Sequence, residues 1–122
     1  MAYQISSDPI TTIGTTAGFI DLISIAAGSC VTLSGNVLCV SSTGLVRAWN
    51  VTRTGKRLVG GSPTLVGSAP AAVVESDASF APAIALAVGG ATGDLIRIQC
   101  TGVSGATIRW VAIVQATELS IT

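Results

Sequence analysis

Histidine is absent from this 122-residue chain, and the other residue types that commonly carry catalysis are few. Without histidine the chain offers no Ser–His–Asp or Cys–His nucleophile system and lacks the commonest metal ligand. Acid–base chemistry would have to use carboxylates that lie near the N-terminus, in expected turns or at strand ends. These are Asp8, Asp21, Glu75, Asp77, Asp94 and Glu118. We therefore expect no enzyme activity and no catalytic residue.

Glu75 and Asp77 are the one close pair of carboxylates, two positions apart in an expected exposed loop. A hydrolase pair needs partial burial to separate its two pKa values. A calcium ion needs several oxygen ligands, and no Asp-rich calcium loop surrounds this pair. We expect the pair to be solvated and to cap a turn.

The three cysteines, Cys30, Cys39 and Cys100, lack the C-x-x-C spacing of zinc sites. If residues 34–36 (Ser-Gly-Asn) form a hairpin turn, Cys30 and Cys39 could face each other across it and form a disulfide. The alternative is a pair of buried thiols, which we favour because cytoplasmic synthesis keeps thiols reduced. We expect neither a metal nor a cofactor.

Trp49 and Trp110 are expected to anchor the core or an interface. Arg47 and Arg109 lie two residues and one residue away from them, so a carbohydrate platform stays open as a weaker alternative. Nucleic acid is not expected as a partner, because the net charge is zero and residues 53–57 hold the one basic cluster.

The amino-acid composition is typical of a protein that works as part of a larger assembly. Hydrophobic residues make up 49% of the chain and charged residues only 10%, against roughly a quarter charged in typical soluble domains. A surface of Ser, Thr, Gly and Ala loses water cheaply because few charges must be desolvated. No signal peptide is evident, and the longest apolar run, residues 80–88, is far too short to span a membrane.

Short β-rich runs separated by glycine turns predict an all-β fold, an antiparallel β-sandwich of jelly-roll type. Residues 80–88 are ambiguous between helix and strand, and we favour a strand because of Pro82 and the nearby glycines. A further turn is expected at residues 54–56. The expected strands cover residues 19–25, 31–33, 37–40, 45–53, 57–59, 64–67, 72–74, 80–88, 94–101 and 107–117.

The last two strands alternate most clearly. Ile98 and Cys100 should share an apolar face with Leu95 or Ile96, and the final strand should place Ile108, Trp110, Ala112 and Val114 on one face. The opposite face of the final strand, with Val111 and Ile113, is also apolar. We expect that second face to be covered, either by a neighbouring subunit or because the strand is central in its sheet.

Residues 1–16 are polar and nearly uncharged, and residues 8–9 (Asp-Pro) interrupt any regular element. We expect an extended N-terminal arm over residues 1–16 and a single β-sandwich domain over residues 17–122. Such arms often lie on a neighbouring subunit. The expected interface residues are Tyr3, Ile5, Ile10, Ile13, Trp49 and Trp110.

Residues 43–119 contain a strand ending at residues 53–55 (Arg-Thr-Gly), then residues 64–67 (Thr-Leu-Val-Gly) and an alanine-rich strand ending at residues 87–90 (Ala-Val-Gly-Gly). In this order the segments resemble a domain of tailed-bacteriophage virion proteins. The most specific part of the resemblance is a strand over 94–100, the T-G-x-x-G segment 101–105, and a strand over 107–112 that contains Trp110. This part looks like the terminal hairpin of tail-fibre domains and small head-decoration proteins.

The resemblance implies a virion structural protein built as a trimeric β-sandwich. The absence of heptads or a long shaft favours a capsid cement or decoration protein over a tail fibre. The expected partners are the major capsid protein and two further copies of the chain. The expected location is the capsid exterior, after synthesis in the host cytoplasm. The alternative is a tail-fibre or receptor-binding tip domain that recognises a host surface glycan.

Overall fold

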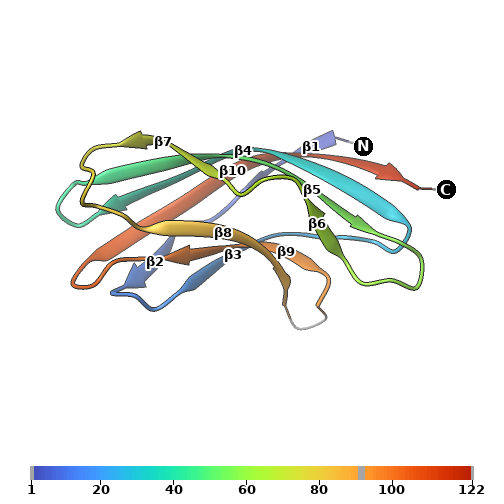
Figure 1. Ribbon diagram of the computed structural model, residues 1–122, viewed down its shortest axis with the longest axis horizontal. Coiled ribbons are helices and arrows are strands. Elements are labelled where there is room, and N and C mark those ends of the chain that lie inside the picture. Colours follow the sequence, from blue (N-terminus) through green and yellow to red (C-terminus); the bar gives the residue numbers. More distant parts are fainter. Residues whose placement is uncertain (1, 91–92, 122) are drawn as a thin grey trace.

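The computed structural model describes residues 2–90 and 93–121. Residue 1 of the expected arm and residues 91, 92 and 122 of the expected domain lie outside the described residues. The described residues form ten strands and contain no helix (Figure 1). All strand pairs are antiparallel. The predicted all-β antiparallel class is therefore confirmed, whereas its assignment to a jelly-roll sandwich stays a prediction.

One sheet contains seven strands and is built around the two longest. β4 (Ser29–Ser41) lies between β10 (Thr107–Ser120) and β5 (Val46–Arg57). Beyond β10 lie β1 (Ala2–Ser6) and β2 (Ile10–Ile13). Beyond β5 lie β6 (Thr64–Val66) and β7 (Ala71–Glu75).

The second sheet has three strands, in the order β3 (Gly18–Ser24), β9 (Leu95–Thr101) and β8 (Ala83–Gly89). Figure 1 shows the two sheets as separate layers, with β8 drawn in front. The layers approach closely at Gly55 of β5, where an added Cβ would lie 2.6 Å from Cδ1 of Ile96 on β9. A larger residue at this position would force the side chains of Ile96 and Ile25 to move.

Period-two alternation gives both sheets one shared core. The faces predicted for β9 and β10 are confirmed, because Ile96, Ile98 and Cys100 are buried together with Ile108, Trp110, Ala112 and Val114. Residues 83–89 form a strand, as favoured.

Two predicted turns are wrong. β4 runs without a break through Gly35, and β5 runs through Gly55 to Arg57. Gly35 lies within β4, opposite Val114 of β10 and Val51 of β5. It must be glycine because an added Cβ would overlap the carbonyl oxygen of Ile113 on β10. Both glycines permit close approach of a neighbouring element, and neither reverses the chain.

The expected hairpin between Cys30 and Cys39 does not exist. The two residues lie near opposite ends of β4, where Cys30 opposes Lys56 and Cys39 opposes Arg47 on β5. All three cysteines are free thiols, with Cys39 and Cys100 fully buried and Cys30 half-buried. The thiol alternative is the one that the structure supports.

The segment expected as an arm lies in the sheet of its own chain. β1 and β2 both pair with β10, and the break between them falls at residues 7–9, where Asp8 and Pro9 were expected to interrupt regular structure. Ser7 keeps the ladder closed across this break: its N–H donates to the Ala112 carbonyl, and its hydroxyl accepts from the Ala112 N–H. The expectation of an arm reaching a neighbour is thus not met by the described residues 2–16.

Candidate docking surface

Five of the six expected interface residues face the core. Tyr3 opposes Ala116, Ile5 opposes Val114, and Ile10 opposes Trp110, all on the inward side of β10. These three side chains are half-buried against the core. Burial, the charge of Glu118 and a hydrogen bond to that carboxylate raise the pKa of Tyr3.

The two tryptophans are core residues. Trp49 is 4% exposed and Trp110 is 1% exposed, and their rings stack with centroids 5.7 Å apart. The Trp110 indole N–H donates to the hydroxyl of Thr12, which is itself buried. Neither ring can contact a partner or a sugar in this conformation. Among the six expected interface residues, Ile13 alone is strongly exposed.

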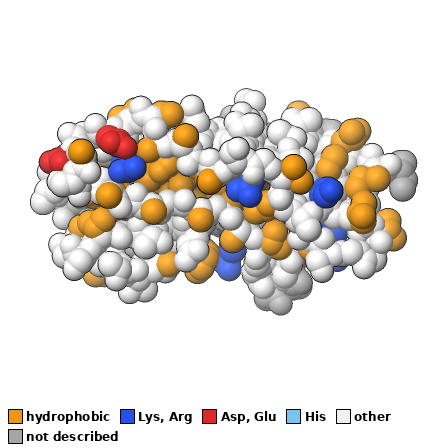
Figure 2. Space-filling view, viewed as in Figure 1, with side chains coloured by type: hydrophobic (Ala, Val, Ile, Leu, Met, Phe, Trp, Pro, Cys, Tyr) orange, Lys and Arg blue, Asp and Glu red, His pale blue; other side chains and the backbone are white. Residues whose placement is uncertain are grey.

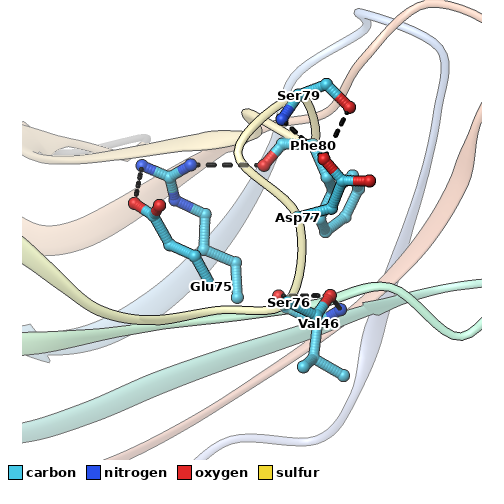
Figure 3. A network of polar contacts seen from close by, with 7 residues as sticks. Val46, Glu75, Ser76, Asp77, Ser79 and Phe80 are labelled. Atoms are coloured by element: carbon cyan, nitrogen blue, oxygen red, sulfur yellow. Dashed lines mark hydrogen bonds and ion pairs between the residues drawn. The ribbon is translucent and has the colours of Figure 1, made fainter.

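The carboxylates form local contacts that organise turns. Asp77 accepts hydrogen bonds from the backbone N–H and the hydroxyl of Ser79, both at 2.8 Å (Figure 3). These bonds lower the pKa of the Asp77 carboxyl. Glu75 pairs with Arg47 at 3.1 Å, and Arg47 also donates to the Phe80 carbonyl. The predicted turn-capping role is confirmed for Asp77.

Two other ion pairs join neighbouring elements. Arg97 pairs with Asp21 at 2.9 Å across β9 and β3, and its guanidinium lies over the Phe19 ring. The Nη1 atom of Arg57 lies 3.7 Å from the Oδ2 atom of Asp94. The described residues contain no group of three or more side chains that could hold a metal ion, and they include no helix able to cross a membrane.

The outward face of β4 and β10, together with neighbouring β7, carries an apolar patch. We define the apolar patch as Leu38, Val40, Val74, Val111 and Ile113, of which Val111 is half-buried and the others are exposed. Leu38 and Ile113 are 47% and 51% exposed, which is high for side chains of this size in the middle of long strands. Period-two geometry puts them there, because the alternate residues on the same strands already fill the core.

Strand register makes the apolar patch continuous. Leu38 opposes Val111 on β10 and Ala48 on β5, and Ala48 in turn opposes Val74 on β7. Val40 lies in the next row, between Arg109 and Val46. Pro9, Leu38, Val40 and the β10 residues 109–111 line an open hollow of about 240 Å³.

The rest of this face is almost uncharged and mixes polar residues with the separately placed, exposed apolar side chains of Ile13, Val66 and Leu119. Within β4, β5 and β10, its charged side chains are Arg109 beside the apolar patch and Lys56 at the opposite end. The neutral polar residues on this face of the three strands are Thr32, Ser34, Asn36, Asn50, Thr52, Thr54, Thr107, Gln115 and Thr117. The Thr32 and Thr54 hydroxyls bond each other across the strands at 3.0 Å. A partner could cover this face while removing water from few charges.

Part of this surface could be predicted from the sequence. The second apolar face of the final strand, with Val111 and Ile113, was recognised as needing a cover. Leu38 and Val40 were missed because a false turn at Gly35 separated them from the rest of β4. Among the described residues, no segment covers Leu38, Val40, Val74 or Ile113, and Val111 is half-buried.

Comparisons with protein-family models, with curated proteins and with solved structures found no match. The resemblance to phage virion proteins therefore depends on the residues quoted for it, and the chemistry of the docking surface has to be argued from the surface itself.

Proposed function

We propose that this protein is a virion structural protein of the capsid cement or decoration type, with no catalytic role. It would attach to the outside of a bacteriophage head by placing the outward face of its seven-stranded sheet on the major capsid protein. The observation that carries this proposal is the apolar patch, which is exposed in the middle of an almost uncharged face.

The physical basis is the low cost of burial. Removing apolar area from water contributes about 25 cal/mol per Å² before the entropic cost of association. The neutral Thr, Ser, Asn and Gln side chains around the apolar patch can exchange water for polar groups of the partner. Many copies on one head would add avidity, since each bound copy helps to hold the neighbouring capsid subunits together.

The resemblance supplies the rest of the proposal. The segment matching T-G-x-x-G joins β9 to β10, and Gly105 within it has a φ of +78°, a conformation that favours glycine. A trimeric jelly-roll sandwich, a position on the capsid exterior and synthesis in the host cytoplasm remain parts of this proposal. The contact surface differs from the one first expected, because residues 2–16 belong to the sheet.

Binding to purified heads that lack the protein tests the proposal. Leu38→Lys should weaken binding roughly tenfold or more, because it places a charge in the centre of the buried area. Ser24→Lys is the control, because this exposed residue lies on β3 in the three-stranded sheet and therefore outside the proposed contact face. The proposal fails if Leu38→Lys leaves head binding unchanged, or if both variants weaken binding equally.

The copy number of the protein in intact particles decides between head and tail. A cement protein should be present in hundreds of copies, whereas a tail component would be present in a few. The glycan-binding alternative receives no support from the tryptophans on which it depended, because both are buried.

A further inference from the structure

The free edge of β8 differs from the other strand edges of the molecule. We propose that β8 pairs antiparallel with β8 of a second copy of this chain, so that two three-stranded sheets join into one continuous six-stranded sheet. The proposal concerns the three-stranded sheet and does not depend on binding to a capsid.

The edges of the seven-stranded sheet are interrupted. On one side the edge is divided between β1 and β2 by residues 7–9. On the other side it is divided between β6 and β7, and the register shifts between Ala48 and Trp49. Short and broken edges of this kind discourage pairing with another chain.

The β3 edge of the three-stranded sheet is also protected. Its register with β9 shifts between Asp21 and Ile23, and Asp21 brings a charge to the edge. Bulges and charged residues are the usual means by which proteins block an edge strand.

The β8 edge has none of these protections. Its seven residues, Ala83–Gly89, include no charge and no proline, and they pair with β9 without a register shift. β6 comes near β8 but shares no ladder with it. Figure 2 shows the side of the molecule on which β8 lies, with hydrophobic side chains in orange among few charged ones. The backbone groups along this edge can be satisfied by another strand.

The occupant is a second copy because the strand is complementary to itself. Antiparallel pairing about the midpoint, Leu86, opposes Ala85 to Ala87 of the other copy and Ile84 to Val88. Side chains that face each other directly in an antiparallel pair lie on the same side of the sheet. The outward small residues would therefore meet small residues, and the half-buried Ile84 and Val88 would cover each other. A charged strand that pairs with its own copy would bring like charges together, but β8 carries no charge.

Sedimentation equilibrium of the full chain over a concentration series is the first test. A reversible dimer is expected for the free protein, whereas the trimer of the proposed function would form on the head. Ala85→Lys should raise the dimer dissociation constant roughly tenfold or more, because a lysine on an edge strand opposes pairing. Gln99→Lys is the matched control: it puts the same charge in the same row on central β9, and should leave the dissociation constant nearly unchanged. A chain that is monomeric at every concentration overturns the proposal. So does a dimer that is insensitive to Ala85→Lys or equally sensitive to both variants.

Cysteine cross-linking tests the register without relying on a destabilising change. In a Cys30→Ser background, an equal mixture of the Ala85→Cys and Ala87→Cys variants should form a disulfide-linked dimer on mild air oxidation. Each variant alone should form much less, because the substituted position does not oppose itself in this register. Equal cross-linking in all three samples, or none in the mixture, would count against pairing about Leu86.

Discussion

Gly35 lies in β4 where the backbone of β10 leaves no room for a side chain. Gly35→Ala should lower the free energy of unfolding by at least about 2 kcal/mol, because the new methyl group would meet the backbone of β10, which cannot rotate away. Gly61→Ala is the control, since an added Cβ there makes only ordinary contacts and should change stability by no more than about 0.5 kcal/mol. Urea denaturation measures both, and equal effects would show that the clash at Gly35 is relieved.

Thr12 supplies the buried acceptor for Trp110. Thr12→Val should cost about 1–3 kcal/mol of unfolding free energy, because the indole N–H would be left buried without a partner. The exposed neighbour Thr11 provides the comparison: Thr11→Val should be nearly neutral in the same denaturation experiment. A Thr12→Val protein as stable as the parent would mean that the indole finds another acceptor.

The buried thiols should be unreactive in the native protein. Burial raises the pKa of Cys39 to about 11, and burial followed by the charge of Cys39 raises the pKa of Cys100 to about 12. Both groups are therefore neutral at pH 8, and a thiol reagent should modify only Cys30 unless the chain is unfolded. Labelling of all three cysteines in the native state at pH 8 would contradict this placement.

The same thiols give stability a defined pH dependence. Above the ordinary thiol value of 9.0, the unfolded chain releases these protons while the folded chain retains them. The stabilisation is thus complete below about pH 9 and is lost progressively as the pH rises through 11 and 12. Urea denaturation at alkaline pH should show this decline, and the Cys39→Ala, Cys100→Ala double variant should show less of it.

At the level of elements, β1 and β2 behave as structural strands. Deleting residues 1–16 should lower the unfolding temperature substantially, because β10 would lose both partners on one edge and Trp110 would lose its acceptor. Deleting residues 1–6 alone should have a smaller effect, since β2 and Thr12 remain. Far-UV circular dichroism during heating distinguishes the two deletions. If the 1–16 deletion unfolded at the same temperature as the full chain, these residues would be an arm after all.

Local pattern predicted the strands better than it predicted their ends. Alternation correctly assigned the buried faces of β9 and β10, because period two is a property of each strand alone. Gly35 and Gly55 were taken for turns because the sequence does not show which distant residues pass close to a glycine. Trp49 and Trp110 were expected at an interface because they are large. Whether a large residue of a strand faces the core or a partner depends on which of the two strand faces the opposing sheet covers. The docking surface was therefore only half visible, through Val111 and Ile113.

At the level of the whole molecule, the small number of surface charges predicts how salt affects binding to heads. Attachment to heads through the apolar patch should change little as sodium chloride is raised, because few ion pairs would be screened. Sulfate, which strengthens apolar burial, should tighten attachment. Equilibrium binding to heads in both salts measures this. Attachment that weakened steeply with sodium chloride would indicate an ionic interface instead.

The stacked tryptophans on β5 and β10 have an optical consequence. Two indoles 5.7 Å apart, with 19° between their planes, should couple electronically and give a paired positive and negative band in the circular dichroism spectrum. The two rings lie on strands that flank β4, and a one-residue slip of either strand would turn one ring toward solvent. The couplet would then disappear even if the total strand content stayed the same. The chain therefore carries its own label-free reporter of correct strand alignment, which could be followed as copies of the protein assemble.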